Sequence, residues 1–335
     1  MVICDDSLTL NPIVSVAIIT YNHGCFLSQC IDHVLSQITD FDFEIVIADD
    51  YSLDGAREIC KEYQKKYPNK IKLILQDTNV GLINNYCSLL DACRGEFIAQ
   101  VSGDDYWCDD NKLKKQVESL QINQDCDLCY TNTYYCDKNG VLNGVGLEKS
   151  HIDVCFVRHL INAGYLAPNS WMFRRTVLSY LDMQSWFTDE SLALALDVLA
   201  HSKFFYLDEV TSVYRVHNGS AAAQTQIEKK WKYHEGIFRM QLYYAEKYVR
   251  SEEVVQHIKM QGYVTNMLLS LEAKDSDFVS EALSYYRDNG MELKWFVESC
   301  KEYVRYKMQF DQIRRSNAYR LGKTLLKPFK WLRKK

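Results

Sequence analysis

Glycine and proline are scarce in this 335-residue chain, which has only 14 glycines and 4 prolines. This scarcity excludes a collagen-like repeat and argues against a low-complexity or largely disordered protein. The chain has no apolar run of the roughly 18 residues that a membrane-spanning helix requires. Residues 1–11 lack a basic start followed by an apolar stretch, so we expect no secretory signal peptide and a cytoplasmic location.

Two common phosphate-binding motifs are also missing. The sequence contains neither GxGxxG nor GxxxxGK[ST], which argues against a dinucleotide-binding dehydrogenase and a P-loop NTPase. If the protein binds phosphate groups, a metal ion must therefore neutralise their charge.

Twelve cysteines are present, and in a cytosolic protein we expect reduced thiols. The nearest approach to a zinc pattern is Cys126, Cys129, Cys136 and Cys155. One CxxC without a second CxxC or a histidine pair is a weak zinc signal. We interpret these residues as buried free thiols.

What is present is a regular alternation of strand and helix patterns. Apolar residues make up 47% of the chain and charged residues 25%, as in ordinary soluble proteins. Short apolar runs predict strands, and helically spaced apolar residues predict helices between them. The expected strands are 14–19, 43–48, 71–75, 97–101 and 127–134, and the expected helices are 26–35, 56–67, 82–93 and 112–121.

This alternation predicts an α/β fold with a mostly parallel sheet covered by helices on both faces. Ligands of such sheets bind at the carboxyl ends of the strands. A further helix is expected at 192–199 and a strand at 204–216, and from residue 227 the pattern is helical to about 308. We expect three parts: residues 1–222, a helical region 223–312 and a basic tail 313–335.

Polar side chains follow the first two strands. Thr20, Tyr21 and Asn22 end the first strand, and an aromatic ring beside short polar groups can hold a nucleobase, although an ordinary strand–helix loop has the same composition. Asp49 and Asp50 end the second strand. A helix cap is the alternative there, but buried carboxylates need partners, and the imide N–H of uracil or ribose hydroxyls would suit them.

The fourth strand ends in Ser102-Gly103-Asp104-Asp105, the most specific local motif of the sequence. Adjacent carboxylates offer hard oxygen ligands for Mg²⁺ or Mn²⁺. A solvated turn is the alternative, but the repetition of carboxylate pairs after two strands makes it less attractive.

Later in the chain Asp189 and Glu190 open an expected helix. Acidic residues at a helix start can simply stabilise its dipole; alternatively, one of them is a general base. Arg215 and His217 alternate along a strand and share one face, where they could meet a pyrophosphate.

Taken together, the segments TYNHG, IADDYSLD, DTNVG, VSGDDYW, TDESL and LDEVTSVYRVH resemble the family 2 inverting glycosyltransferases of bacteria, with the glycosyltransferase-A fold. The resemblance covers about residues 13–220. It implies a catalytic domain at 1–222 that binds a nucleotide-sugar, most often a UDP-sugar.

The resemblance also implies roles for single residues. It places Tyr21 and Asp50 at the nucleobase, and Asp104 and Asp105 at the ribose and the divalent metal. It makes Asp189 the catalytic base, with Glu190 as the second candidate. It places His217 near the diphosphate and the metal. We also expect Thr20, Asn22, Asp49, Asn79 and Gly81 to contact the nucleotide. Arg215 is expected to contact the diphosphate. Two departures are Ser102, where the family often has an acid, and the order Asp189-Glu190, where the family has Glu-Asp.

The end of the chain is strongly basic. Residues 314–335 contain nine Lys and Arg and no acid, so the net charge of −5 becomes −14 without them. Leu321, Leu325, Phe329 and Leu332 share one side of a helical projection, opposite Lys323, Lys327, Lys330 and Lys334. This pattern favours a helix on an anionic membrane surface, although Pro328 would kink it. The alternative is a helix that packs on the remainder of the chain, which is acidic. The negative charge of that remainder argues against binding of nucleic acid by the tail.

The sequence thus predicts a glycosyltransferase with a Mn²⁺ or Mg²⁺ cofactor at the inner face of the plasma membrane. It would transfer a sugar to a glycan or lipid-linked glycan of a surface polysaccharide. The alternative from another class is a nucleotide-sugar-binding scaffold with little catalysis. A nucleotidyltransferase is disfavoured because TYNHG is not a glycine-rich basic triphosphate loop. The oligomeric state and the sugar are not encoded in any motif.

Overall fold

The computed structural model describes residues 1–288 except 6, 10, 146–153, 164–165 and 218–225. Contacts divide the chain into two compact units, Met1–Ile258 and Lys259–Lys335. The boundary expected near residue 222 lies outside the described residues. The helix that follows it, α7 (Ile227–Tyr244), belongs to the first unit, so this helix has to be considered together with the sheet. The basic tail at 313–335 also lies outside the described residues.

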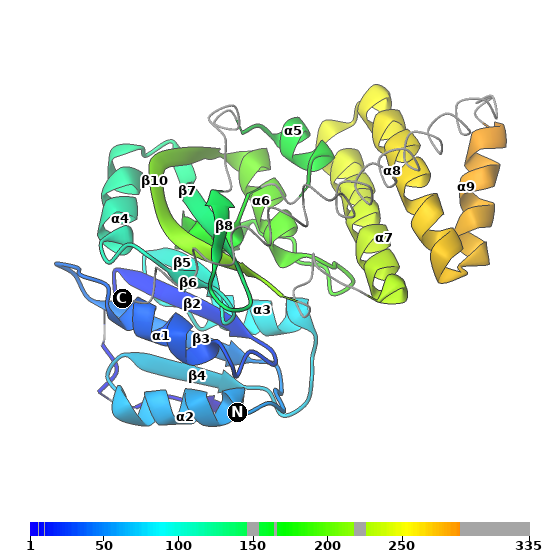
Figure 1. Cartoon of the computed structure of the whole chain (residues 1–335). Coiled ribbons are helices and arrows are strands. Elements are labelled where there is room, and N and C mark those ends of the chain that lie inside the picture. The colour runs from blue at the N-terminus through cyan, green and yellow to red at the C-terminus, as the bar shows by residue number, and fades with distance from the viewer. Residues whose placement is uncertain (6, 10, 146–153, 164–165, 218–225, 289–335) are drawn as a thin grey trace, which may run out of the picture. The chain divides into compact units, whose positions relative to one another are not determined.

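A ten-stranded sheet forms the centre of the first unit (Figure 1), in the order β1-β4-β3-β2-β5-β9-β7-β10-β6, with β8 paired to β7. The neighbours β4 (Ile71–Leu75), β3 (Phe43–Asp49), β2 (Val14–Thr20) and β5 (Phe97–Ser102) are all parallel. Nearly every residue of these strands is buried, as expected for a sheet covered on both faces. The predicted mostly parallel sheet is confirmed.

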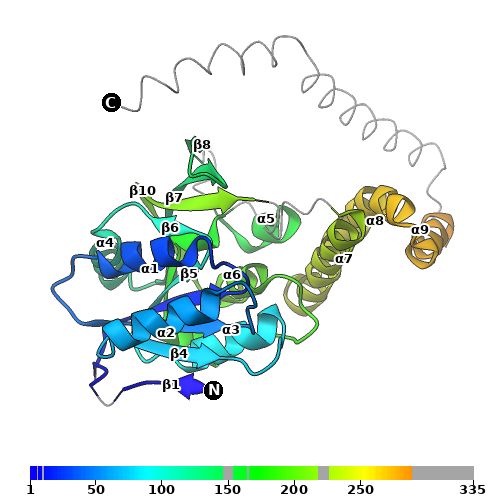
Figure 2. The same cartoon turned by 60° about the horizontal axis from the view of Figure 1, so that its bottom comes forward.

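Two groups of helices cover the faces of this sheet. Apolar residues of α1 (Leu27–Leu35), α2 (Ala56–Lys66) and α4 (Lys112–Ile122) form one buried cluster with alternate residues of the strands. The other face packs against α3 (Leu82–Asp91) and α6 (Glu190–His201). The result is a three-layer α/β/α arrangement (Figures 1 and 2), in which the carboxyl ends of β2, β3 and β5 meet at one edge.

The second half of the sheet is built on one long parallel pair. β7 (Cys126–Asp137) and β10 (Lys203–Val216) run side by side over most of their length (Figure 2). The short strands β6 (Tyr106–Trp107) and β9 (Met172–Arg174) pair antiparallel with β10 and β7. A turn at 137–140 joins β7 to β8 (Leu142–Val145), which also pair antiparallel. The path of β10 brings its last residues back to the end of β5.

The remaining described elements are short or helical. They are β1 (Val2–Ile3), α5 (Phe156–Ile161), the 3-10 turns η2 (Pro168–Ser170) and η3 (Arg175–Ser179), the π-helical turn η5 (Ala245–Val249), α8 (Glu252–Ala273) and α9 (Ser276–Asp288). None of the helices within the described ranges is long and apolar enough to cross a membrane. The described cysteines are free thiols, and Cys126, Cys129 and Cys136 are buried as predicted; the prediction is wrong for Cys155, which is exposed.

Candidate active site

The loops that follow β2 and β3 are tied to each other at the edge of the sheet. The backbone N–H of Asn22 donates to Ser52 Oγ (2.8 Å), and the Asn22 side-chain oxygen accepts from the N–H of Leu53 (3.0 Å). Asn22 and Tyr51 both have left-handed backbones, with φ of 56° and 63°. Asparagine tolerates this conformation, whereas tyrosine adopts it at a cost of about 1 kcal/mol. The two hydrogen bonds between the loops stabilise this strained conformation.

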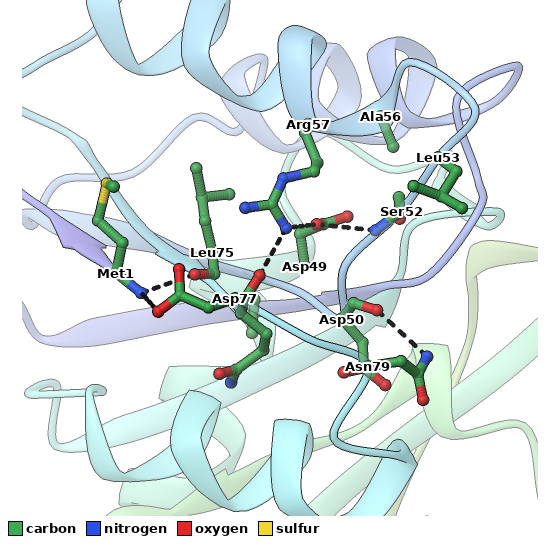
Figure 3. A network of polar contacts seen from close by, with 12 residues as sticks. Met1, Asp49, Asp50, Ser52, Leu53, Ala56, Arg57, Leu75, Asp77 and Asn79 are labelled. Carbon is green, nitrogen blue, oxygen red and sulfur yellow. Dashed lines mark hydrogen bonds and ion pairs between the residues drawn. The ribbon is translucent and has the colours of Figure 1, made fainter.

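Asp50 organises a third loop, the one that precedes α3. Its carboxylate accepts hydrogen bonds from the backbone N–H groups of Val80 (2.7 Å) and Gly81 (3.0 Å). Its backbone carbonyl accepts from the Asn79 side chain at 3.2 Å (Figure 3). Gly81 has φ of 85°, which a residue without Cβ adopts freely. The structure therefore brings together Asp50, Asn79 and Gly81, three predicted nucleotide-binding residues that are far apart in the sequence.

Asp49 points the other way and is fully buried. One carboxylate oxygen accepts from Ser52 N–H (3.1 Å) and from Arg57 (3.0 Å), which also donates to the Gln76 carbonyl (Figure 3). These contacts fix the turn between β3 and α2 to the end of β4. The structure thus gives Asp49 a bracing position beneath the loop, while its predicted contact with a nucleotide stays a prediction.

The two other predicted residues of the first loop differ in exposure. Tyr21 is 48% exposed, whereas Thr20 is 1% exposed. Thr20 Oγ1 is buried with no hydrogen-bond partner in the described part of the chain. Tyr51, which sequence analysis did not single out, is 41% exposed at the end of the adjacent strand. Two tyrosine rings are therefore available at this edge for stacking on a flat ligand.

Asp104 lies between two histidines. One of its carboxylate oxygens is 3.0 Å from Nε2 of His217 and 3.7 Å from Nε2 of His23. Burial by itself would raise the pKa of Asp104, but the two imidazoles and a hydrogen bond from Ser102 outweigh it, so the pKa is lowered. A Cβ on Gly103 would lie 2.8 Å from Thr20 Oγ1 and 3.1 Å from His23 Nδ1. Glycine is needed here for the loops to approach.

Asp105 faces away from the histidines and is 3% exposed. It accepts a hydrogen bond from the backbone N–H of Arg215 at 2.8 Å. Burial and the neighbouring Asp104 charge raise its pKa well above the ordinary range. Arg215 is equally buried and donates to the Asp104 carbonyl (2.9 Å) and to Gln29 (2.8 Å). The structure therefore places Arg215 as a brace beneath the carboxylate pair, and its predicted diphosphate contact stays a prediction.

A divalent cation fits the side of this motif that Asp104 presents. Asp104 and His217 would hold it, and His23 Nδ1 is a buried polar atom without a hydrogen-bond partner in the described ranges. Within those ranges no group of three or more His, Cys, Asp or Glu side chains is arranged to hold a metal. Oxygens from a bound diphosphate and water would have to complete the shell. A carboxylate with an imidazole suits Mn²⁺ better than Mg²⁺.

The acidic pair at the start of α6 is divided between two environments. Asp189 is the N-cap of the helix: one carboxylate oxygen accepts from Leu192 N–H (2.8 Å) and Ser191 Oγ (2.7 Å). The other accepts from the Tyr233 hydroxyl at 2.8 Å. Glu190, by contrast, receives no hydrogen bond on its carboxylate from another described residue. Its surface is partly exposed.

The Glu190 carboxyl group is nevertheless surrounded by protein. This desolvation, followed by the charges of Asp189 and Asp104, raises the pKa of Glu190 to about 8. Burial, followed by the charge of Glu190, raises the pKa of Tyr86 on α3. Burial, followed by the charge and the hydrogen bond of Asp189 and then by the charge of Glu190, raises the pKa of Tyr233 on α7. The charge of Asp104 is among the causes of the raised pKa of Glu190, so the carboxyl groups of Glu190 and Asp104 interact electrostatically.

Sequence analysis did not find the contribution of α7. Tyr233 bonds to Asp189, and Met240 Sδ accepts from Thr188 N–H at 3.3 Å. A Cβ on Gly236 would overlap Thr188 Oγ1, so only glycine allows this close approach. These residues follow the acidic pair by more than 40 positions, in a region where no motif marks them. Of the missed residues only His23 carried a signal, because it belongs to the segment TYNHG.

Comparison with known proteins identifies the family. Residues 15–181 match the family model described as Glycosyl transferase family 2. An uncharacterized glycosyltransferase of Nostoc, alr2836, is 31% identical over 239 residues, which are 67% of this chain and 72% of that protein. The chain belongs to this family. This assignment confirms the resemblance that the sequence motifs around Asp50 and Asp104 indicated.

Other relatives of this family 2 protein extend the comparison. The uncharacterized protein Rv1520 of Mycobacterium tuberculosis is 30% identical over 65% of this chain, and the match spans 63% of its own length. The Escherichia coli enzyme WfaP, named as a UDP-Glc:alpha-D-GlcNAc-diphosphoundecaprenol beta-1,3-glucosyltransferase, is 29% identical over 63% of this chain and 80% of that protein.

Solved structures support the fold. Staphylococcus aureus TarS 1-349 in complex with UDP has a TM-score of 0.52 at 20% identity, covering 84% of this chain and 75% of that one. The Pyrobaculum calidifontis mannosyltransferase PcManGT in complex with GDP-Man and Mn²⁺ has a TM-score of 0.56 at 14% identity, covering 94% and 84%. At these identities the comparison establishes the glycosyltransferase-A fold alone.

Proposed function

We propose that this protein transfers a sugar from a nucleoside-diphosphate sugar, in the first instance a UDP-sugar, to a hydroxyl of a glycan or lipid-linked glycan. The observation that supports it is the convergence of Asp50, Asp104 and the acidic pair of α6 on the carboxyl edge of one parallel sheet. The names of WfaP and of the TarS complex suggest UDP as the nucleotide. The diphosphoundecaprenol in the name of WfaP suggests a lipid-linked acceptor, and the proposed role of the reaction is surface polysaccharide synthesis.

The proposed reaction is a single displacement. An acidic side chain of α6 takes the proton of the acceptor hydroxyl while that oxygen bonds to the anomeric carbon. The bond from this carbon to the diphosphate oxygen breaks, and the diphosphate leaves with the electron pair. Attack from the face opposite the leaving group inverts the anomeric configuration. A bound divalent cation would stabilise the charge that develops on the diphosphate.

The chain's own residues would prepare this displacement. Tyr21 and Tyr51 present rings for the base, and Asp50 presents a carboxylate fixed by two backbone N–H groups. Asp104 and His217 would meet the cation and the diphosphate. The electrostatic interaction between Glu190 and Asp104 supports catalysis over a purely binding scaffold, because acids with perturbed pKa values are typical of catalytic sites.

Nucleotide binding tests the donor site directly. We expect UDP to raise the melting temperature more than GDP, dTDP or CDP do, and the increase to depend on Mn²⁺. Binding at 100 times Kd stabilises a folded protein by about 2.7 kcal/mol, which corresponds to several degrees for a unit of this size. The measurement is a thermal-shift series with each nucleotide, with and without Mn²⁺.

Two variants control this measurement. Asp104→Asn should remove the Mn²⁺-dependent part of the shift, whereas Asp91→Asn, an exposed carboxylate on α3, should leave it unchanged. Failure of all four nucleotides to shift the melting temperature would contradict a preformed donor site.

A further inference from the structure

The segment that precedes α6 exposes one large aromatic ring, that of Trp186, which is 47% exposed. We propose that Trp186 binds a sugar ring of the glycan acceptor, with its indole stacked on the C–H face of that ring. This proposal rests on the proposed function, because it names how the acceptor of that same transfer is held.

Trp186 differs from the other described tryptophans. Trp107, Trp171 and Trp231 are at most 2% exposed, and a residue of this size is highly buried on average. Leaving an indole in water forgoes the free energy that its burial would contribute. A ligand that covers the ring of Trp186 would recover this free energy.

Two aromatic neighbours hold the ring of Trp186. Its centre lies 4.7 Å from the centre of the Phe187 ring and 5.8 Å from that of Tyr243 on α7. Both neighbours are nearly perpendicular to the indole, so neither covers it by parallel stacking. Phe187 is 5% exposed and anchors the pair in the protein. A ring that is fixed in advance loses little conformational freedom when a ligand binds.

Polar contacts of Asp182 fix the loop that carries Trp186. The Asp182 carboxylate accepts hydrogen bonds from the Gln184 side chain and from the Tyr243 hydroxyl. It also accepts from the ammonium group of Lys247 at 2.6 Å. The loop is therefore tied to α7 and to the turn that follows it, and the exposure of Trp186 is not a consequence of a loosely attached segment.

The loop leads directly to the acidic pair. Three residues separate Trp186 from Asp189, so their Cα atoms are at most about 11 Å apart. Thr188 lies between them and is fixed on α7, where its N–H donates to Met240 Sδ at 3.3 Å and its side chain leaves no room for a Cβ on Gly236. A glycan whose terminal hydroxyl lies at the acidic pair would thus have its next sugar rings within reach of the indole.

The surroundings of Trp186 favour a sugar over a protein or a membrane. Leu181 and Met183 of the same segment pack on the core, whereas Ser185 is exposed and Gln184 half-buried. A stable protein interface buries about 800 Å² on each partner, and a helix that lies on a membrane presents a row of apolar side chains. A sugar needs one aromatic face for its C–H groups, which the negative face of the ring attracts, and polar neighbours for its hydroxyls.

A glycan array tests binding without turnover. The full chain should bind oligosaccharides on an array of bacterial surface glycans, and Trp186→Ala should weaken this binding by about tenfold, because both ring contact and buried area are lost. Trp186→Phe keeps a ring and should retain most of the binding. The control is Ile122→Ala, at an 80% exposed position of α4. No retained glycan, or equal binding by Trp186→Ala, would overturn the proposal.

Turnover separates the acceptor from the donor. Hydrolysis of a UDP-sugar by water does not use a sugar platform, so Trp186→Ala should keep the kcat and the donor KM of this reaction, together with the UDP thermal shift. With a glycan that the array retains as acceptor, the KM for the glycan should rise about tenfold. A change in donor KM or in the UDP shift would overturn the proposal, because Trp186 would then act on the donor site or on the fold.

The outcomes for this proposal and for the proposed function are distinct. Glycan binding that depends on Trp186, without UDP binding or turnover, would contradict only the proposed function. UDP binding and hydrolysis, without glycan binding that depends on Trp186, would contradict only this proposal. If Trp186→Ala lowered sedimentation with phosphatidylserine vesicles but not glycan binding, the ring would contact lipid and the proposal would be wrong.

Discussion

Lys112 lies wholly inside the protein at the start of α4. Its ammonium group is 4.6 Å from the centre of the Trp107 ring and donates to the Gln116 side chain. Burial lowers the pKa of Lys112 to about 7. Folding therefore removes the Lys112 ammonium group from water and places it beside the ring of Trp107, two residues after Asp105.

This burial predicts a pH-dependent stability. Between about pH 7 and the ordinary lysine pKa of about 10.4, the unfolded chain binds a proton at Lys112 that the folded protein lacks. The contribution of this residue to the free energy of unfolding therefore rises with pH, by at most about 1.4 kcal/mol per unit. Lys112→Met should lose this rise in urea unfolding between pH 7 and 10. Exposed Lys229→Met on α7 is the control. Equal slopes in all three proteins would show that Lys112 does not titrate in this range.

Single residues at the candidate site show how far sequence reasoning reached. The motifs located Asp50 and Asp104 correctly at the ends of their strands, because an apolar run followed by acids fixes where a buried strand meets solvent. They could not tell that Asp49 and Asp105 are bound by Arg57 and Arg215, whereas Asp50 binds the loop before α3 and Asp104 lies beside His217. The direction of each side chain depends on partners such as Arg57 and Arg215, which come from other elements.

At the scale of elements, α7 is the helix whose role could not be predicted. Its sequence has a helical apolar pattern but no catalytic motif. The structure packs it against the loop that carries the acidic pair. Tyr244 of α7 and Tyr248 of the following turn η5 both donate to Asp197 on α6. A helix expected to belong to a separate region thus supports the candidate active site.

This packing predicts an unusual effect of a helix glycine. Replacing glycine by alanine inside a helix usually stabilises it by about 0.5–1 kcal/mol. Gly236→Ala should instead destabilise the first unit by about 1–3 kcal/mol, because its Cβ would overlap Thr188. Chemical denaturation measures the change. The control is Lys232→Ala at an exposed position of the same helix, which should change stability by no more than about 0.5 kcal/mol. A stabilised Gly236→Ala protein would mean that α7 does not press on the loop.

The order of strands is the second element-scale feature that the sequence left open. The continuous apolar runs predicted the parallel strands β2, β3, β4 and β5 because fully buried strands need apolar residues on both faces. The short strands β6 and β9 have two and three residues. Segments this short show no alternation of apolar and polar residues, so the sequence cannot predict them. They pair because β7 and β10 have edges open to them.

For the whole molecule, the basic tail at 313–335 remains a prediction from sequence, since it lies outside the described residues. We expect the full chain to sediment with vesicles that contain phosphatidylserine and to lose this binding when residues 313–335 are removed. Each Lys or Arg near an anionic surface contributes about 1 kcal/mol, and salt screens it. Vesicles of phosphatidylcholine alone are the control. Equal sedimentation of both proteins would favour a tail that packs on the acidic body.

The sequence by itself determined the α/β class, the positions of the main strands and the loops that carry the acids, because burial requires apolar residues at fixed periods. It also contained the family's motifs in order. Only the tertiary structure decided which oxygen of each carboxylate has a partner, and that the Tyr233 hydroxyl of α7 donates to Asp189. Hydrogen bonding and desolvation depend on residues brought together from distant parts of the chain, and no local pattern encodes that proximity.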